Sequence, residues 1–289
     1  MSPSIKDRLL RLSLQSAALI SGTLVLIIVG FLLFEALPGL RHIGLIRFFD
    51  DPSWHPHEDA AAGSFNLVPM MVGTLTATLG AILLALPLAL LSSILLFLYL
   101  PPLPARLYER LIELLAGIPS VVYGFWGLVV LVPLIRHIAP PGASLLSGTL
   151  ILALMILPTI TLIISAAFAT VPTLQLAGAA ALGMSRVGLL RACVLPMVKK
   201  NIFTAILLGT GRALGETMAV LMVTGNIVQF PTSPLDSIRT LTANIALEMG
   251  YAAGDHRMAL FVSALLLLAL VTALVLAAEK VSGTTHASQ

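Results

Sequence analysis

Charge is what this sequence has least of. Only 10% of its 289 residues are Asp, Glu, Lys or Arg, whereas 58% are apolar and the mean hydropathy is +1.03. A soluble domain needs about 25% charged residues to cover its water-facing surface. A water-soluble globular protein is therefore excluded. The composition predicts an all-α polytopic membrane protein whose apolar runs of about 20 residues cross the bilayer.

Cysteine is nearly absent too, because Cys193 is the only one. A single cysteine excludes an internal disulfide. The N-terminus carries Lys6, Arg8 and Arg11 ahead of an apolar run, as a signal peptide does. That run, 12–34, has 23 residues and is longer than the 7–15 residues of a signal-peptide core. We therefore expect a retained first helix.

Uncharged runs predict six membrane spans. The second falls within 65–100, a run too long for a straight helix in a hydrocarbon core of about 30 Å. Pro69 and Pro87 are expected to bend it, or its first turns lie in the interface. The six expected spans are about 12–37, within 65–100, 112–136, 146–170, 202–228 and 258–278.

The basic residues set the expected orientation. An even number of spans places both termini on one side, with ten Lys and Arg residues there and five on the other side. Because cytoplasmic loops carry the excess of Lys and Arg, both termini are expected in the cytoplasm. The net charge of +3 is distributed by membrane side, and no nucleic-acid partner is expected.

The longest inward loop, 171–201, is amphipathic in parts. Gly183 suits the left-handed turn after a short helix, and Ser185 suits the cap of a second one. Pro196 is expected to mark the re-entry into the membrane. Two readings stay open on spacing alone: a docking element for a soluble partner, or a plain connector at the membrane surface.

The same loop resembles the cytoplasmic signature of ABC importer permeases, E-A-A-x3-G-x9-I-x-L-P. The resemblance implies that this loop docks on a partner ATPase. Ala177 stands in place of the glutamate, Gly178 in place of the first alanine and Cys193 in place of the isoleucine. The signature falls on Ala177, Gly178, Ala179, Gly183, Cys193, Leu195 and Pro196.

Three further stretches resemble the C-type permease of the phosphate-specific transport (Pst) system: "AGIPSVVYGFWGLVVLVP", "GRALGETMAVLMVTGN" and "LTANIALEMGYAAGDHRMALF". The resemblance runs from about residue 65 to the last helix. It implies the type I (MetI-like) importer fold, with five core helices preceded by one N-terminal helix. The implied division of the chain is 1–64, with the first helix and an outward loop, and 65–289, the permease domain with its coupling loop.

The resemblance also implies partners and a place in the cell. These are an A-type sister permease, a dimer of a cytoplasmic ATPase that binds ATP and Mg²⁺, and a periplasmic phosphate-binding protein. The chain itself is expected to hold no cofactor or metal and to lie in a bacterial inner membrane.

Arg212 and Glu216 stand inside the apolar fifth span. Arg212 lies twelve residues beyond Lys200, about 18 Å along a helix and so near the midplane. On insertion scales a charge there costs about 2.5–3.5 kcal/mol. Pairing at i, i+4 on one helix face returns only about 0.2–0.5 kcal/mol, and Arg before Glu is the weaker order. We expect Arg212 to contact an anion and Glu216 to orient it, and a structural salt bridge to a neighbour is the alternative.

Other side chains near this pair are weaker candidates for the substrate pathway. Ser120 and Tyr123 could donate to an oxyanion, although a packing role is favoured for both. Thr217 lies beside Glu216, where a hydrogen bond to its own backbone or to a neighbouring helix is favoured over contact with the substrate. The outward loop holds His55, His57, Glu58 and Asp59, for which a docking surface is favoured over a metal site, with Trp54 at the membrane interface.

The leading hypothesis is therefore a permease subunit of an ATP-driven phosphate importer that performs no covalent chemistry. A permease for molybdate, sulfate or phosphonate is one alternative, and a stand-alone proton-coupled carrier is another. A membrane enzyme is disfavoured because the sequence contains no HExxH or GxSxG motif.

Overall fold

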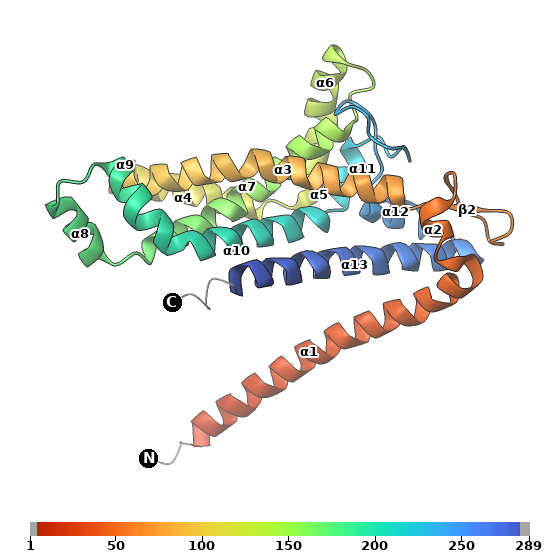
Figure 1. Ribbon diagram of the computed structural model, residues 1–289, viewed down its shortest axis with the longest axis horizontal. Helices are drawn as coiled ribbons and strands as arrows, with labels where there is room; N and C mark the ends of the chain where they lie inside the picture. The colour runs from red at the N-terminus through yellow and green to blue at the C-terminus, as the bar shows by residue number, and fades with distance from the viewer. Residues whose placement is uncertain (1–4, 284–289) are drawn as a thin grey trace. The chain divides into compact units, whose positions relative to one another are not determined.

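The computed structural model describes residues 5–283, which are mostly helical (Figure 1). Within them the chain forms two compact units. The N-terminal unit comprises residues 5–66 and 248–266, and the core unit comprises 67–247 and 267–283.

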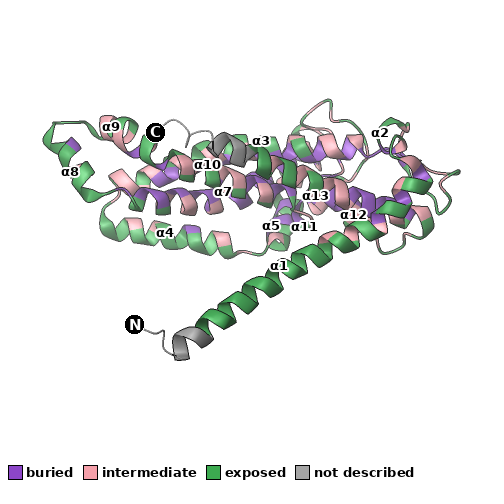
Figure 2. Ribbon diagram, turned by 60° about the horizontal axis from the view of Figure 1, so that its bottom comes forward, coloured by how far each residue is buried: buried purple, intermediate pink, exposed green. Residues whose placement is uncertain are grey.

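The N-terminal unit is one long helix followed by a small folded element. Most of α1 is exposed along its apolar length (Figure 2), as expected for a helix that lipid covers. Two short antiparallel strands form a hairpin in this element, in which Trp54 pairs with Phe65 and His55 with Ser64. The elements are α1 (Ile5–Gly39), the π-helical turn η1 (Leu40–Gly44), α2 (Arg47–Asp50), β1 (Trp54–His55), β2 (Ser64–Phe65) and the first part of α13 (Gly254–Gly283).

The core unit is a helical bundle whose helices change direction at short breaks or π-helical turns. Its elements are α3 (Val68–Ile94), η2 (Leu95–Tyr99), α4 (Pro102–Gly117), α5 (Ser120–Trp126), η3 (Gly127–Leu131), α6 (Val132–Ile138), α7 (Leu145–Ala169), α8 (Thr173–Ala181), α9 (Arg186–Leu189), η4 (Leu190–Val194), α10 (Leu195–Leu214), α11 (Met218–Val223) and α12 (Leu241–Glu248).

Helix α7 forms the centre of the core unit, with α3, α4 and α10 packed against it (Figures 1 and 2). It carries apolar residues on all sides, a pattern that is stable only when the helix is surrounded. Helix α3 approaches it closely because a stripe of small residues faces inward, as in many membrane helix pairs. The stripe consists of Ala77, Ala81, Ala85 and Ala89, each at most 1% exposed.

Six helices in the described part of the chain are long and apolar enough to cross a membrane, which agrees with the number predicted. They are Leu10–Gly44, Val68–Tyr99, Ser120–Ile138, Leu145–Ala169, Arg186–Leu214 and Gly254–Ala277. Pro69 lies in the first turn of α3, where the missing N–H removes no helix bond, and the helix continues past Pro87. The predicted all-α class with six membrane-spanning helices is therefore confirmed.

Two predicted span boundaries are wrong. The third span begins at Ser120 and not near 112, because Ile118 and Pro119 interrupt the helix and residues 102–117 form the separate helix α4. The fifth does not run unbroken from 202 to 228, because α10 ends at Leu214 and α11 starts at Met218. Glu216 and Thr217 therefore lie in a break, and Arg212 and Glu216 do not share one helix face.

The loop at 171–201 folds as the sequence indicates at two positions. Gly183 takes a φ of +69° directly after α8, and Ser185 Oγ accepts a hydrogen bond from the Gly188 N–H at 3.1 Å at the start of α9. Pro196, however, does not stop the helix. In the preceding turn η4 the N–H groups hydrogen-bond to carbonyl oxygens five residues earlier, as in a π-helix. The chain therefore continues as a helix through Pro196 into α10.

Candidate functional site

Arg212 ends helix α10 with its guanidinium exposed in this chain. Its Nη1 donates a hydrogen bond of 3.3 Å to Thr159 Oγ1 of α7. A cation in the last turn of a helix is favoured by the helix dipole. The rest of this guanidinium has no hydrogen bond or ion pair among the described residues, so it is free to bind a further group.

The depth of Arg212 follows from neighbouring contacts. A Cβ on Gly209 would lie 2.8 Å from Ile160, and Arg212 itself bonds to Thr159, so this part of α10 lies beside the middle of α7. Thr159 precedes the end of α7 at Ala169 by ten residues, or about 15 Å. Arg212 therefore lies beside the middle part of α7, which agrees with its predicted position near the midplane.

Glu216 does not contact Arg212 in the described part of the chain. Its Oε1 accepts a hydrogen bond of 3.1 Å from the Ala219 N–H at the start of α11. Its main-chain oxygen accepts one of 2.8 Å from Thr242 Oγ1 of α12. Glu216 therefore fixes the break between α10 and α11. No hydrogen bond or ion pair joins Glu216 to Arg212 among the described residues, so the orienting role of Glu216 stays a prediction.

Tyr123 and Ser120 lie at the start of α5. Tyr123 is buried and its hydroxyl donates a 2.8 Å hydrogen bond to the Leu115 oxygen of α4, while Arg212 is close enough to act on it electrostatically. Ser120 is half-buried, and Thr217 Oγ1 donates a 3.3 Å bond to the Gly215 oxygen. The structure thus gathers Arg212 and Tyr123 in one region.

The glycines around α5 explain how this region packs. A Cβ on Gly124 would lie 2.8 Å from Ala219 Cα, and one on Gly127 would lie 2.8 Å from Ile151. These two glycines allow α5 to approach its neighbours, as expected from small residues between membrane helices. A Cβ on Gly117, by contrast, would have nothing within 4 Å, so this glycine allows no close approach within this chain.

The residues of the predicted coupling loop form an exposed element. Leu174 and Leu182 are 82% and 83% exposed, and Ala177 and Gly178 of α8 are exposed as well. Ala179 is buried, Leu195 is half-buried, and Pro196 lies in the first turn of α10. Apolar side chains this exposed outside the lipid-covered spans indicate an interaction surface.

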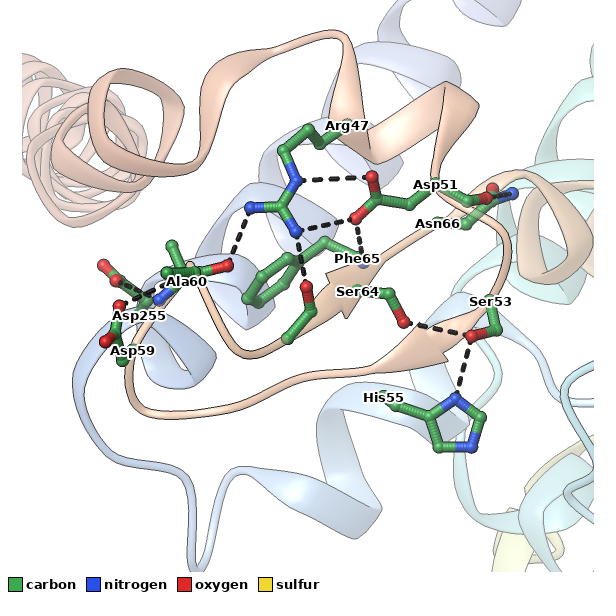
Figure 3. A network of polar contacts seen from close by, with 12 residues as sticks. Arg47, Asp51, Ser53, His55, Asp59, Ala60, Ser64, Phe65, Asn66 and Asp255 are labelled. Carbon is green, nitrogen blue, oxygen red and sulfur yellow. Dashed lines mark hydrogen bonds and ion pairs between the residues drawn. The ribbon is translucent and has the colours of Figure 1, made fainter.

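The loop between α2 and α3 in the N-terminal unit is held by a polar network that the sequence did not predict (Figure 3). Arg47 donates to Asp51 Oδ1 at 3.2 Å, to the Ala60 oxygen at 2.8 Å and to the Gly63 oxygen. Asp51 in turn accepts from the Phe65 N–H at 2.8 Å. The i, i+4 spacing of Arg47 and Asp51 in the sequence could have predicted their ion pair. The main-chain oxygens that also accept from Arg47 could not be predicted from the sequence.

Trp54 is buried and does not anchor the chain at the membrane interface, so that expectation is wrong. Its indole Nε1 donates to Glu248 Oε2 at 2.9 Å, and His256 Nε2 lies 2.9 Å from the same oxygen. His55 and His57 make local bonds, to Ser53 Oγ and from the Asp59 N–H. Residues 5–283 contain no group of three His, Cys, Asp or Glu side chains arranged to hold a metal ion.

A family model supplies the decisive comparison. Residues 81–282 match the binding-protein-dependent transport system inner membrane component. This chain belongs to that family. It is a multi-pass inner membrane protein, and its fold and transport-subunit class follow from this membership.

Individual relatives agree with the family assignment. A phosphate transport system permease protein PstC of Mesorhizobium japonicum is 33% identical, over 95% of this chain and 89% of its own length. A probable ABC transporter permease protein YqgH of Bacillus subtilis is 38% identical, over 77% of this chain and 74% of its own length. The predicted kinship with C-type phosphate permeases is therefore confirmed.

Solved structures share the fold. A chain of the MetNI methionine ABC transporter in an inward-facing conformation aligns with a TM-score of 0.62 at 18% identity, covering 74% of this chain and 94% of its own. A chain of a bacterial alginate ABC transporter aligns with a TM-score of 0.60 at 16% identity, covering 96% and 99%. At these identities the likeness concerns the fold alone.

Proposed function

We propose that this chain is the permease subunit of an ATP-driven importer of inorganic phosphate and forms half of the translocation pathway. The observation that carries the proposal is the Arg212 guanidinium, exposed about 15 Å from the end of α7 with one hydrogen bond to Thr159. A charge at this depth is costly unless it faces water, a cargo or another subunit. A guanidinium matches two oxygens of a phosphate at once.

The substrate assignment is supported by the relatives. PstC proteins from several bacteria are named for phosphate transport and align over most of this chain. In the proposal Arg212 contacts the anion, Tyr123 and Ser120 lie along its path, and Glu216 and Thr217 shape the break beside it. A bare carboxylate on phosphate would be repelled, so Glu216 orients and does not bind.

The partners follow from the proposed reaction. An A-type sister permease completes the pathway, a periplasmic phosphate-binding protein delivers the anion, and a dimer of a cytoplasmic ATPase binds ATP and Mg²⁺. The exposed loop at 171–201 docks that ATPase through α8 and α9, with Ala177 in place of the acidic residue of the signature. The chain performs no covalent chemistry and holds no cofactor of its own, and both of its termini face the cytoplasm.

Transport in proteoliposomes tests the proposal. The complete complex is supplied with binding protein loaded with phosphate, sulfate, molybdate or a phosphonate, and uptake and ATP hydrolysis are measured for each. We expect uptake and stimulated hydrolysis with phosphate. Preferential uptake of another oxyanion would assign the permease to that anion instead.

The driving force is tested in the same vesicles. An ATPase variant that binds but does not hydrolyse ATP is expected to abolish uptake while a proton gradient is maintained. Uptake that persists with this variant and responds to the gradient would identify a proton-coupled carrier and contradict the proposal.

A further inference from the structure

Helix α4 carries a row of charges that begins between the second and third spans expected from the sequence. We call this row the charged face of α4, and it consists of Arg106, Glu109, Arg110 and Glu113, all exposed. Their spacing of i, i+3, i+4 and i+7 places them on one side of the helix. A second side carries an apolar stripe, also exposed, made of Leu103, Leu107, Leu111 and Leu114. Helix α4 thus presents two chemically different surfaces that this chain does not cover.

The charged face lies beside the last turns of the membrane-spanning segment Val68–Tyr99. Helix α4 folds back along the end of α3, because Ser92 Oγ and Tyr108 Oη are 2.9 Å apart. Ser92 is seven residues before the end of η2 at Tyr99, and Tyr108 is six residues after the start of α4. Arg110 and Glu113 therefore lie about 12 and 16 Å from this turn along α4.

The same depth is reached by Arg212. The ends of η2 and α7 lie level with each other, since the rings of Phe97 and Phe168 are 5.4 Å apart. Arg212 bonds to Thr159, about 15 Å from the α7 end. Arg110, Glu113 and Arg212 consequently occupy one level of the core unit. Charges at that level are costly in lipid, so they require water, an anion or another charge.

An open cavity lies along the charged face of α4. Its volume is about 650 Å³, and it is lined by Arg110, Glu113, Leu114, Gly117, Ile118 and Pro119. The cavity ends where α5 begins. There Tyr123 donates to the Leu115 oxygen in the last turn of α4, and Arg212 acts on Tyr123 electrostatically. Tyr123 therefore links the level of Arg212 to the cavity on α4.

We infer that the charged face of α4 lines the cytoplasmic half of the anion path, with Arg110 as a second anion-binding side chain after Arg212. The inference rests on the proposed function, because it concerns the same anion. A path must bind its cargo weakly enough to release it. Glu113, three residues from Arg110 on the same face, lowers the net positive charge there and makes Arg110 the weaker site. The anion is then passed from Arg212 towards the cytoplasm.

Thiol labelling of the assembled complex tests the water path. Arg110→Cys and Gly117→Cys place thiols in the cavity, and Gly117 has open space for the new side chain. Leu111→Cys, on the apolar stripe, is the matched control. A charged methanethiosulfonate reagent applied from the cytoplasmic side reacts with thiolates, which form in water and not in lipid. Peptide mass spectrometry reads each position separately from Cys193.

We expect the cavity thiols to react at least about tenfold faster than the thiol of Leu111→Cys, since desolvation suppresses the thiolate. Equal labelling at all three positions would overturn the inference. So would unreactive thiols in both cavity variants while phosphate uptake is normal, which would instead place the charged face against another subunit and leave the proposed function intact.

Protection by anions tests the role of Arg110. Cytoplasmic phosphate is expected to slow the labelling of Gly117→Cys, and Arg110→Gln is expected to weaken this protection about tenfold, as the loss of a charged hydrogen-bond donor does. Absence of protection by any anion would overturn the binding role. Protection by sulfate or molybdate but not phosphate would keep the path and contradict the proposed substrate.

Discussion

Arg47 of the N-terminal unit and Arg212 of the core unit have opposite surroundings. In the N-terminal unit Arg47 bonds to Asp51, Ala60 and Gly63 and also stacks over the Phe65 ring at 5.2 Å. In the core unit Arg212 has one long hydrogen bond, to Thr159. A guanidinium with all its donors used fixes a fold, whereas one with donors unused remains available for a ligand.

The carboxylates show the same difference. Glu248 is buried and its Oε2 is shared by the Trp54 N–H and the His256 ring, so it joins two segments far apart in sequence. Glu113 is exposed and makes no hydrogen bond or ion pair among the described residues. The comparison indicates that structural charges in this protein are recognised by their partners, and we propose that charges without such partners serve transport.

The largest expected effect is on transport and comes from Arg212→Ala. We expect phosphate uptake to fall about 10- to 100-fold, the loss associated with a hydrogen-bonded charge, while the complex still assembles. Uptake in proteoliposomes and co-purification of the partner subunits measure the two outcomes. Loss of assembly would show that Arg212 is structural and would remove the contrast between the two units.

Arg47→Ala is the matched control for this prediction. It removes the same side chain from a site with several partners, so it should lower thermal stability without changing which anion is transported. Unchanged stability would mean that the number of partners does not distinguish the two arginines.

The next effect is on stability and comes from Glu248→Ala. Removing the carboxylate leaves the buried Trp54 donor without this acceptor and separates it from His256, which should cost about 3 kcal/mol. Thermal unfolding of the purified complex measures the loss. Glu248→Gln keeps an acceptor oxygen and should retain more of the stability, so equal losses in both variants would contradict the role assigned to the shared oxygen.

The smallest effect concerns Asp236, a structural charge in a loop of the core unit. Its Oδ2 accepts from Thr232 Oγ1 and N, each at 2.8 Å, and from the Ser233 N–H at 2.7 Å. These bonds, first of all the one from the Thr232 hydroxyl, hold the pKa of Asp236 below its ordinary value of 3.8. A carboxyl with a lowered pKa stabilises its loop above the ordinary pKa and loses that contribution as the pH falls through the lowered value.

Asp236→Asn therefore should increase hydrogen exchange of the 229–240 segment at pH 7, with uptake unchanged. The difference from the parent chain should persist down to the ordinary carboxyl range and disappear only in more acidic buffer. A difference that disappears near neutral pH would contradict this assignment. The result sharpens the comparison, because it shows whether partners or location decide that a charge is structural.

Much of the fold was predictable because lipid imposes simple rules on a sequence. Long uncharged runs gave the six helices, and Gly183 and Ser185 marked the two short helices of the 171–201 loop. The break at 215–217 was not predictable, because the apolar run resumes directly after it at Met218. Glu216 holds the break through a local hydrogen bond from the Ala219 N–H and a tertiary one from Thr242, far along the chain.

The candidate site was predicted in part. Arg212 stood out as a charge in an apolar run, and its depth agrees with the contact to Thr159. Arg110 was not predicted as a site residue, since it falls between the expected spans within 65–100 and at about 112–136. The hydrogen bond between Ser92 and Tyr108 shows that this segment turns back along α3.

The sequence by itself determined that the chain crosses the membrane six times and that Arg212 is an exceptional charge, because burial in lipid depends on composition alone. Only the tertiary structure decided which charges have partners. Hydrogen bonds join residues such as Trp54 and Glu248 that are distant along the chain, and the fold of α4 against α3 places Arg110 level with Arg212. Partners are set by packing, and packing is not a property of any single segment.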